Sequence, residues 1–140
     1  MSDFAIYTEV VEKVRRLMLA YQASVKAEYI ALCHRDGSLI AEVGNLPSCP
    51  EPSLLAVLGN GAYDSAKQMG GMLGGENFQS VSFSGENRSV YISSADNALL
   101  LLQVFPGPKL PNRVEDFNRL LVEKLLEAVP TFTQNTSKLI

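Results

Sequence analysis

The sequence has few of the residues from which metal and nucleophilic sites are built. It contains no tryptophan, one histidine and two cysteines in 140 residues. Cys33 and Cys49 are too few for a disulfide framework, and together with His34 they do not complete the ligand set of a closed zinc site. Neighbouring residues of a strand also point to opposite faces, which separates Cys33 from His34. We therefore expect reduced thiols, no metal ion and no bound cofactor.

Strong charge of either sign and long apolar runs are also absent. The formal net charge is −3, and no basic cluster exceeds the pair Arg15 and Arg16. Neither nucleic acid nor an anionic membrane surface is therefore an expected partner. The N-terminal residues lack the basic and apolar regions of a secretory signal, and the longest apolar stretch, residues 98–105, is too short to span a bilayer. These absences favour a cytoplasmic protein.

Catalytic motifs are missing as well. The sequence has no Gly-x-Ser-x-Gly elbow, and its carboxylates are scattered rather than paired. The glycine-rich residues 70–75 come at the end of a predicted helix, where the helix dipole repels phosphate. None of the arginines stands in a context that marks an arginine finger for GTP hydrolysis. We predict no catalytic residues and a protein that is not itself an enzyme.

What the sequence does contain is a series of amphipathic segments separated by turn residues. Near the N-terminus, apolar residues recur at helical spacing: Phe4, Tyr7, Val11, Val14, Met18 and Tyr21. Strands are predicted at residues 28–34, 39–43, 78–83, 89–93 and 98–105, and further helices at 53–74 and 112–128. The order is α-β-β-α-β-β-β-α. It predicts one domain over residues 1–130 and a loose tail over 131–140.

The strand at residues 98–105 indicates how these elements are layered. It is apolar at nearly every position, so it is expected to lie at the centre of the sheet and to be covered on both faces. The connections between strands are hairpin-like, as at Asp36 and Gly37. We therefore predict an α/β (α+β) sandwich whose five-stranded, mainly antiparallel sheet carries two helices on one face and one on the other.

The helix at residues 53–74 has two unlike faces. One carries an ordinary apolar stripe, which we assign to the core: Leu55, Leu58, Ala62, Ala66, Met69 and Leu73. The opposite face, assigned to the outside, is poor in charge and rich in small residues: Ala56, Gly59, Asn60, Tyr63, Lys67, Gly70 and Gly71. A glycine on a solvated helix costs about 1 kcal/mol relative to alanine. We therefore interpret this face as a site of close approach by another backbone.

The strand at residues 78–83 has no lysine or proline, which usually protect an exposed sheet edge. If this strand lies at the edge, a second copy of the chain can pair with it and extend the sheet. If it lies inside the sheet or is covered, it has no such role. The sequence alone does not order the strands, so both alternatives stay open.

Four segments resemble roadblock / dynein-light-chain domains. They are YIALCHRDGSLIAEVG at residues 29–44, MGGMLG at 69–74, VYIS at 90–93 and LLLLQVF at 99–105. The resemblance covers roughly residues 4–129. It implies a profilin-like fold, a homodimer, and binding and regulation of Ras-like small GTPases without a catalytic residue of its own.

The resemblance also places the dimer contacts on the middle helix and the third strand. The residues that it assigns to the dimer interface are Ala56, Gly59, Asn60, Tyr63, Gly70, Phe78, Ser80 and Ser82. Tyr63 and Lys67 are in addition predicted to touch a partner. An alternative function is a small-molecule-sensing or adaptor module that binds no GTPase. Sensing requires polar groups that converge on a cavity, and Ser65 is one such group on the expected core face.

Overall fold

The computed structural model describes residues 3–128, with side chains over 8–127. The elements follow in the order α1 (Asp3–Val25), β1 (Tyr29–His34), β2 (Leu39–Gly44), α2 (Pro52–Met72), β3 (Ser80–Ser84), β4 (Arg88–Ser94), β5 (Leu99–Pro106) and α3 (Val114–Ala128). This is the predicted order. The predicted tail over residues 131–140 and the side chains of Phe4 and Tyr7 lie outside the described residues. No helix within residues 3–128 is long and apolar enough to cross a bilayer.

The five strands form one antiparallel sheet in the order β2-β1-β5-β4-β3. β5 lies at the centre, and its residues from Leu99 to Phe105 are all buried, as the apolar run predicts. β3 pairs with β4 alone, from Ser80 opposite Ser93 to Ser84 opposite Ser89. The third strand is therefore an edge strand, which resolves the alternative that the sequence left open.

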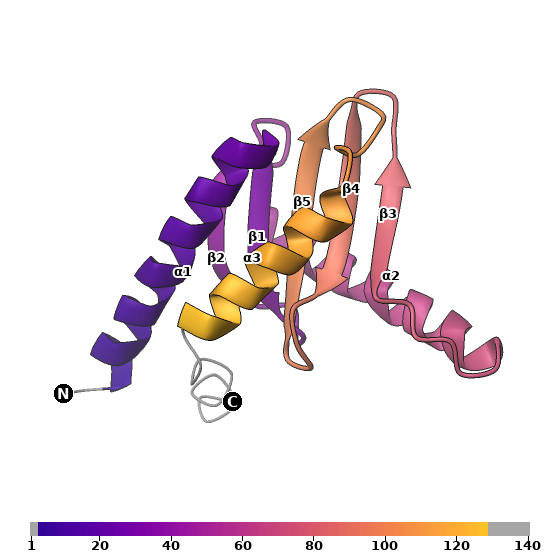
Figure 1. Cartoon of the computed structure of the whole chain (residues 1–140), viewed down its shortest axis with the longest axis horizontal. Coiled ribbons are helices and arrows are strands. Elements are labelled where there is room, and N and C mark those ends of the chain that lie inside the picture. Colours follow the sequence, from indigo (N-terminus) through magenta and orange to yellow (C-terminus); the bar gives the residue numbers. More distant parts are fainter. Residues whose placement is uncertain (1–2, 129–140) are drawn as a thin grey trace.

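Helices cover both faces of the sheet in the predicted two-and-one arrangement. α1 and α3 lie side by side on one face, and α2 crosses the other (Figure 1). The fold is the sandwich expected from the element order, and it agrees with the profilin-like fold that the resemblance implies. Figure 1 also shows that α2 runs past β3, so its C-terminal part projects beyond the edge of the sheet.

Each face of the sheet has its own apolar core. On the α1 and α3 side, Val14 and Met18 pack with Leu121, Leu101 and other buried side chains, and this confirms the stripe predicted for α1 within the described side chains. On the α2 side, the core is built mainly from the sheet itself. Its members are Tyr29, Ala31, Cys33, Ile92, Leu100, Leu102 and Val104, joined by Ala56 and Tyr63 of α2.

Candidate functional site

The predicted orientation of α2 is wrong. Five residues of the face that the sequence assigned to the outside pack on the sheet: Ala56, Gly59, Asn60, Tyr63 and Gly70. Ala66, from the predicted core stripe, is buried beside them. The stripe assigned to the core is largely exposed, and Leu58 keeps 63% of its surface accessible. The reason is that the sheet beneath α2 already carries large side chains from β4 and β5. A helix approaches such a surface closely only through its small residues.

Two glycines of α2 show how close this approach is. A Cβ atom added at Gly59 would lie 2.7 Å from Cδ1 of Leu102. At Gly70, a Cβ would lie 2.1 Å from the backbone oxygen of Glu76, in the segment that leads back to the sheet. Close backbone approach was the correct interpretation of both glycines, but the neighbour is the same chain. Ala56, Gly59, Asn60, Tyr63 and Gly70 are consequently buried within the protomer and are not open to a second copy.

A polar cluster at one end of the sheet fixes the position of α2. Arg35, which follows β1, donates from Nη1 to Oδ1 of Asn60 at 2.8 Å and pairs with Asp64. Nδ2 of Asn60 donates to the backbone oxygens of Ala56 and His34. The Arg35 guanidinium also lies 4.8 Å from the centre of the Tyr63 ring. Asn60 and Arg35 therefore bind α2 to the β1–β2 hairpin.

This cluster changes the predicted partner site. Tyr63 is only 3% exposed, and the Lys67 ammonium group lies 5.7 Å from its ring centre. Of the two residues predicted to touch a partner, only Lys67 is exposed. The buried Tyr63 ring instead makes cation–π contacts with Arg35 and Lys67.

The outer face of α2 is an exposed apolar stripe, which we call the α2 stripe. It consists of Leu54, Val57, Leu58, Met69, Met72 and Leu73. Met72 is 85% exposed, and a Cβ added at Gly61, between the two halves of the stripe, would meet no atom within 4 Å. Large apolar side chains gathered on one exposed helix face indicate a contact surface. The sequence signal was present, but helical spacing alone did not show which face meets the sheet.

The edge strand β3 lies close to α2. Gly85 donates its N–H to Arg88 and Ser94 donates to Gln79, so in the antiparallel register the backbone groups of Val81 and Phe83 face β4. Those of Ser80, Ser82 and Ser84 therefore point away from the sheet. Phe78, just before the strand, is exposed, Ser80 is half-buried and Ser82 is exposed. These three predicted dimer residues lie at an open sheet edge.

No arrangement within the described residues supports catalysis by the protein itself. His34 lies beside Asp36, while burial raises the pKa of the Cys33 thiol to about 12 and makes it a poor nucleophile. No three His, Cys, Asp or Glu side chains among those described gather as a metal site would require. Arg88 pairs with Glu28, and Arg113 pairs with Asp116.

Comparison with known proteins identifies the family of the chain. The sequence profile of the Roadblock/LC7 domain matches residues 13–104. No curated protein sequence matches the chain.

Solved structures share the fold. Myxococcus xanthus MglB superposes with a TM-score of 0.75 at 17% identity, over 85% of this chain and 96% of that one. The gliding protein MglB of Thermus thermophilus gives 0.66 at 25% identity, over 91% and 90%. A structure described as MglB with a tetrameric arrangement gives 0.66 at 24%, over 91% and 90%.

Proposed function

The chain belongs to the Roadblock/LC7 domain family, and on that basis we propose that it is a homodimeric regulatory or scaffold module. Its proposed partner is a Ras-like small GTPase, whose nucleotide cycle or recruitment it modulates. The observation that carries the proposal is the α2 stripe, an exposed apolar surface on the helix that passes β3, the edge strand of the sheet. The proposed site of action is the cytoplasm.

The first part of the proposal is the homodimer. Burial of a large apolar side chain contributes about 1.5–3 kcal/mol, and the six side chains of the α2 stripe stand exposed in one protomer. Pairing two copies of β3 would also satisfy the outward backbone groups of Ser80, Ser82 and Ser84. A second copy is the favoured occupant because it supplies a matching stripe and a matching edge through one two-fold axis.

The dimer interface proposed now differs from the one that the sequence indicated. Phe78, Ser80 and Ser82 remain in it, at the β3 edge. The contribution of α2 moves from its glycine-bearing inner face to the opposite face, with Leu58 and Met69 near the centre of the contact. The close helix contact takes place at Gly61, where a protomer leaves open space.

The second part is the GTPase partner. Support comes from the family and from the likeness to structures named MglB. Arg35 is engaged by Asp64 and Asn60 and is therefore not proposed as an arginine finger. In the proposal the module acts by contact. Lys67, which is exposed and lies over the Tyr63 ring on the side of α2 away from the stripe, is the proposed partner-facing cation.

The experiment combines mass and nucleotide-dependent binding. Light scattering is expected to give twice the 15.3 kDa mass of the chain. Small GTPases encoded in the same genome, loaded with GDP or with a non-hydrolysable GTP analogue, are then titrated with the protein. The expected result is preference for one nucleotide state and a changed rate of hydrolysis or exchange. A dimer that binds none of them in either state would leave an adaptor module and overturn the GTPase proposal.

A further inference from the structure

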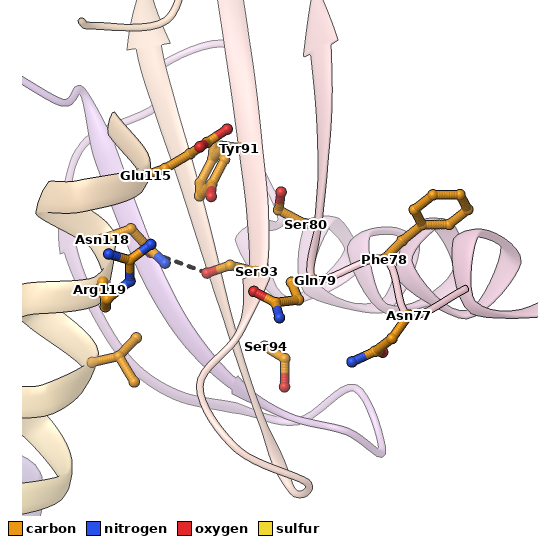
Figure 2. A pocket seen from close by; sticks show the side chains of 11 residues that line it. Asn77, Phe78, Gln79, Ser80, Tyr91, Ser93, Ser94, Glu115, Asn118 and Arg119 are labelled. Atoms are coloured by element: carbon orange, nitrogen blue, oxygen red, sulfur yellow. Dashed lines mark hydrogen bonds between the residues drawn. The ribbon is translucent and has the colours of Figure 1, made fainter. Parts of the chain in front are cut away.

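A polar cleft lies on the opposite face of the sheet from the α2 stripe. It has a volume of about 380 Å³ and opens between the first turns of α3 and the strands β3 and β4 (Figure 2). The residues on which the argument rests are Gln79, Ser93, Ser94, Glu115, Asn118 and Arg119. We call it the α3 cleft. Pockets that hold small molecules span roughly 300–1,000 Å³, so its size suits a small ligand.

A buried chain of hydrogen bonds builds the wall of this cleft. The Tyr21 hydroxyl donates to Oε1 of Gln103 at 2.9 Å, and Nε2 of Gln103 donates to Oδ1 of Asn118 at 2.7 Å. Ser93 Oγ donates to the same Asn118 oxygen at 3.0 Å. Gln103 is fully buried and Asn118 is 7% exposed. Four elements thus hold Asn118 and Ser93 in place at the wall of the cleft.

The direction of this chain decides what the wall offers to a ligand. Burial raises the pKa of Tyr21 to about 12, so its hydroxyl stays protonated and orients the Gln103 amide. Oδ1 of Asn118 then accepts both bonds, which leaves Nδ2 as the amide's free donor among the described residues. Ser93 has used its proton on Asn118, and Ser94 donates to the backbone oxygen of Asp96 at 2.8 Å. The two serine oxygens can therefore only accept.

Opposite charges flank this wall one helical turn apart. Glu115 and Arg119 occupy positions i and i+4 of α3, which lie on the same helix face, and both line the cleft (Figure 2). Within the described residues, Glu115 has no ion-pair partner, and Arg119 makes one long contact, 3.7 Å to Asp116. The cleft therefore presents two sets of groups to a ligand. One is the Asn118 amide donor with the Arg119 cation, and the other is the serine oxygens with the Glu115 anion.

We propose that the α3 cleft binds a free α-amino acid. Arg119 and Nδ2 of Asn118 hold its carboxylate, and Glu115 with the oxygens of Ser93 and Ser94 holds its ammonium group. The side chain of the ligand lies toward Gln79 at the start of β3. The inference does not depend on the proposed GTPase function, because none of the residues that hold the ligand belongs to the α2 stripe. Phe78 and Ser80 of the proposed dimer edge line the same cleft but take no part in holding the two charged groups.

Calorimetric titration with each of the twenty L-amino acids tests the proposal. At least one is expected to bind the full-length protein. For the tightest of them, the analogue without the amino group and the analogue without the carboxylate are expected to bind about tenfold more weakly, since each loses its charge-assisted hydrogen bonds. Failure of all twenty amino acids to bind would overturn the proposal.

Three variants locate the binding. Arg119→Gln and Glu115→Gln are each expected to weaken amino-acid binding about tenfold. Arg119→Gln should leave the affinity for the carboxylate-free analogue unchanged, because that analogue makes no use of the guanidinium. Arg113→Gln is the matched control: Arg113 also pairs with Asp116 but does not line the cleft. Affinity that survives both cleft variants, or that falls equally in the control, contradicts the site.

Discussion

At the scale of residues, the same substitution is expected to stabilise the protein at one glycine of α2 and not at another. Alanine gains about 1 kcal/mol in helix propensity over glycine. At Gly71 the added methyl group enters open space, so Gly71→Ala should raise the free energy of unfolding by up to about 1 kcal/mol. At Gly59 it meets the buried Leu102, and overpacking costs about 1–3 kcal/mol. Gly59→Ala should therefore leave stability unchanged or lower it.

Urea unfolding at equal protein concentration measures both variants. An equal gain at the two positions would show that the inner face of α2 is not packed as closely as the structure has it. A loss at Gly71 would show that this position is not open to solvent.

Buried hydroxyl and thiol groups give the protein a predicted weakness in alkali. Burial raises the pKa of Tyr21 from 10.0 to about 12, that of Cys33 from 9.0 to about 12, and that of Tyr29 as well. In this range the unfolded chain loses protons that the folded protein retains. The stability contributed by these groups is fully present below their unfolded pKa values and is lost as the pH rises from about 9 to 12.

The free energy of unfolding should thus fall steadily across this window. Tyr21→Phe removes one of the titrating groups and is expected to reduce the slope, although it also lowers stability at neutral pH by removing the bond to Gln103. An unchanged slope in this variant would assign the alkaline loss to other groups.

At the scale of elements, substitutions in β3 can test its pairing with β4 and its proposed pairing with a second copy separately. The N–H of Ser82 points away from β4, whereas that of Val81 points toward it. Proline lacks an N–H, so it removes a different hydrogen bond at each position. Ser82→Pro should preserve the β3–β4 pairing and weaken the proposed homodimer.

The matched variant Val81→Pro should instead destabilise the fold. Light scattering measures the dimer, and the thermal midpoint measures the fold. A Ser82→Pro protein that stays dimeric at low micromolar concentration would exclude β3 pairing from the interface.

At the scale of the whole molecule, one exposed leucine on each face of the sandwich allows the two faces to be tested independently as the dimer interface. Leu58, on the α2 stripe, is 63% exposed, and Leu120, on α3, is 52% exposed. A charge placed inside a desolvated contact costs several kcal/mol, whereas on a solvated surface it costs little. Leu58→Glu should convert the protein to a 15.3 kDa monomer that remains folded, while Leu120→Glu should leave the dimer intact.

Light scattering with circular dichroism distinguishes these outcomes. Dissociation by Leu120→Glu, but not by Leu58→Glu, would move the interface to the opposite face of the sheet. Such a result would contradict the proposed dimer and would place the contact at the groove between α1 and α3 that Leu120 lines.

The order of the elements and their layering could be predicted from the amino-acid sequence. The stripe through Val14 and Met18 has the period of a helix with one buried face. The apolar run from Leu99 to Phe105 is typical of a strand that is buried on both faces. Such patterns are local, because each element repeats its burial every few residues. The roadblock resemblance rests on the same local patterns.

Only the packing of the folded chain decided which side of α2 meets the sheet and which strand lies at the edge of the sheet. Both faces of α2 are free of a strong charge pattern, so periodicity did not rank Leu58 against Gly59. The choice depends on the shape of the surface beneath: the large side chains of Leu100, Leu102 and Ile92 accept a helix only through its small residues. That complementarity joins segments far apart in the chain, and it leaves the apolar stripe exposed to a partner.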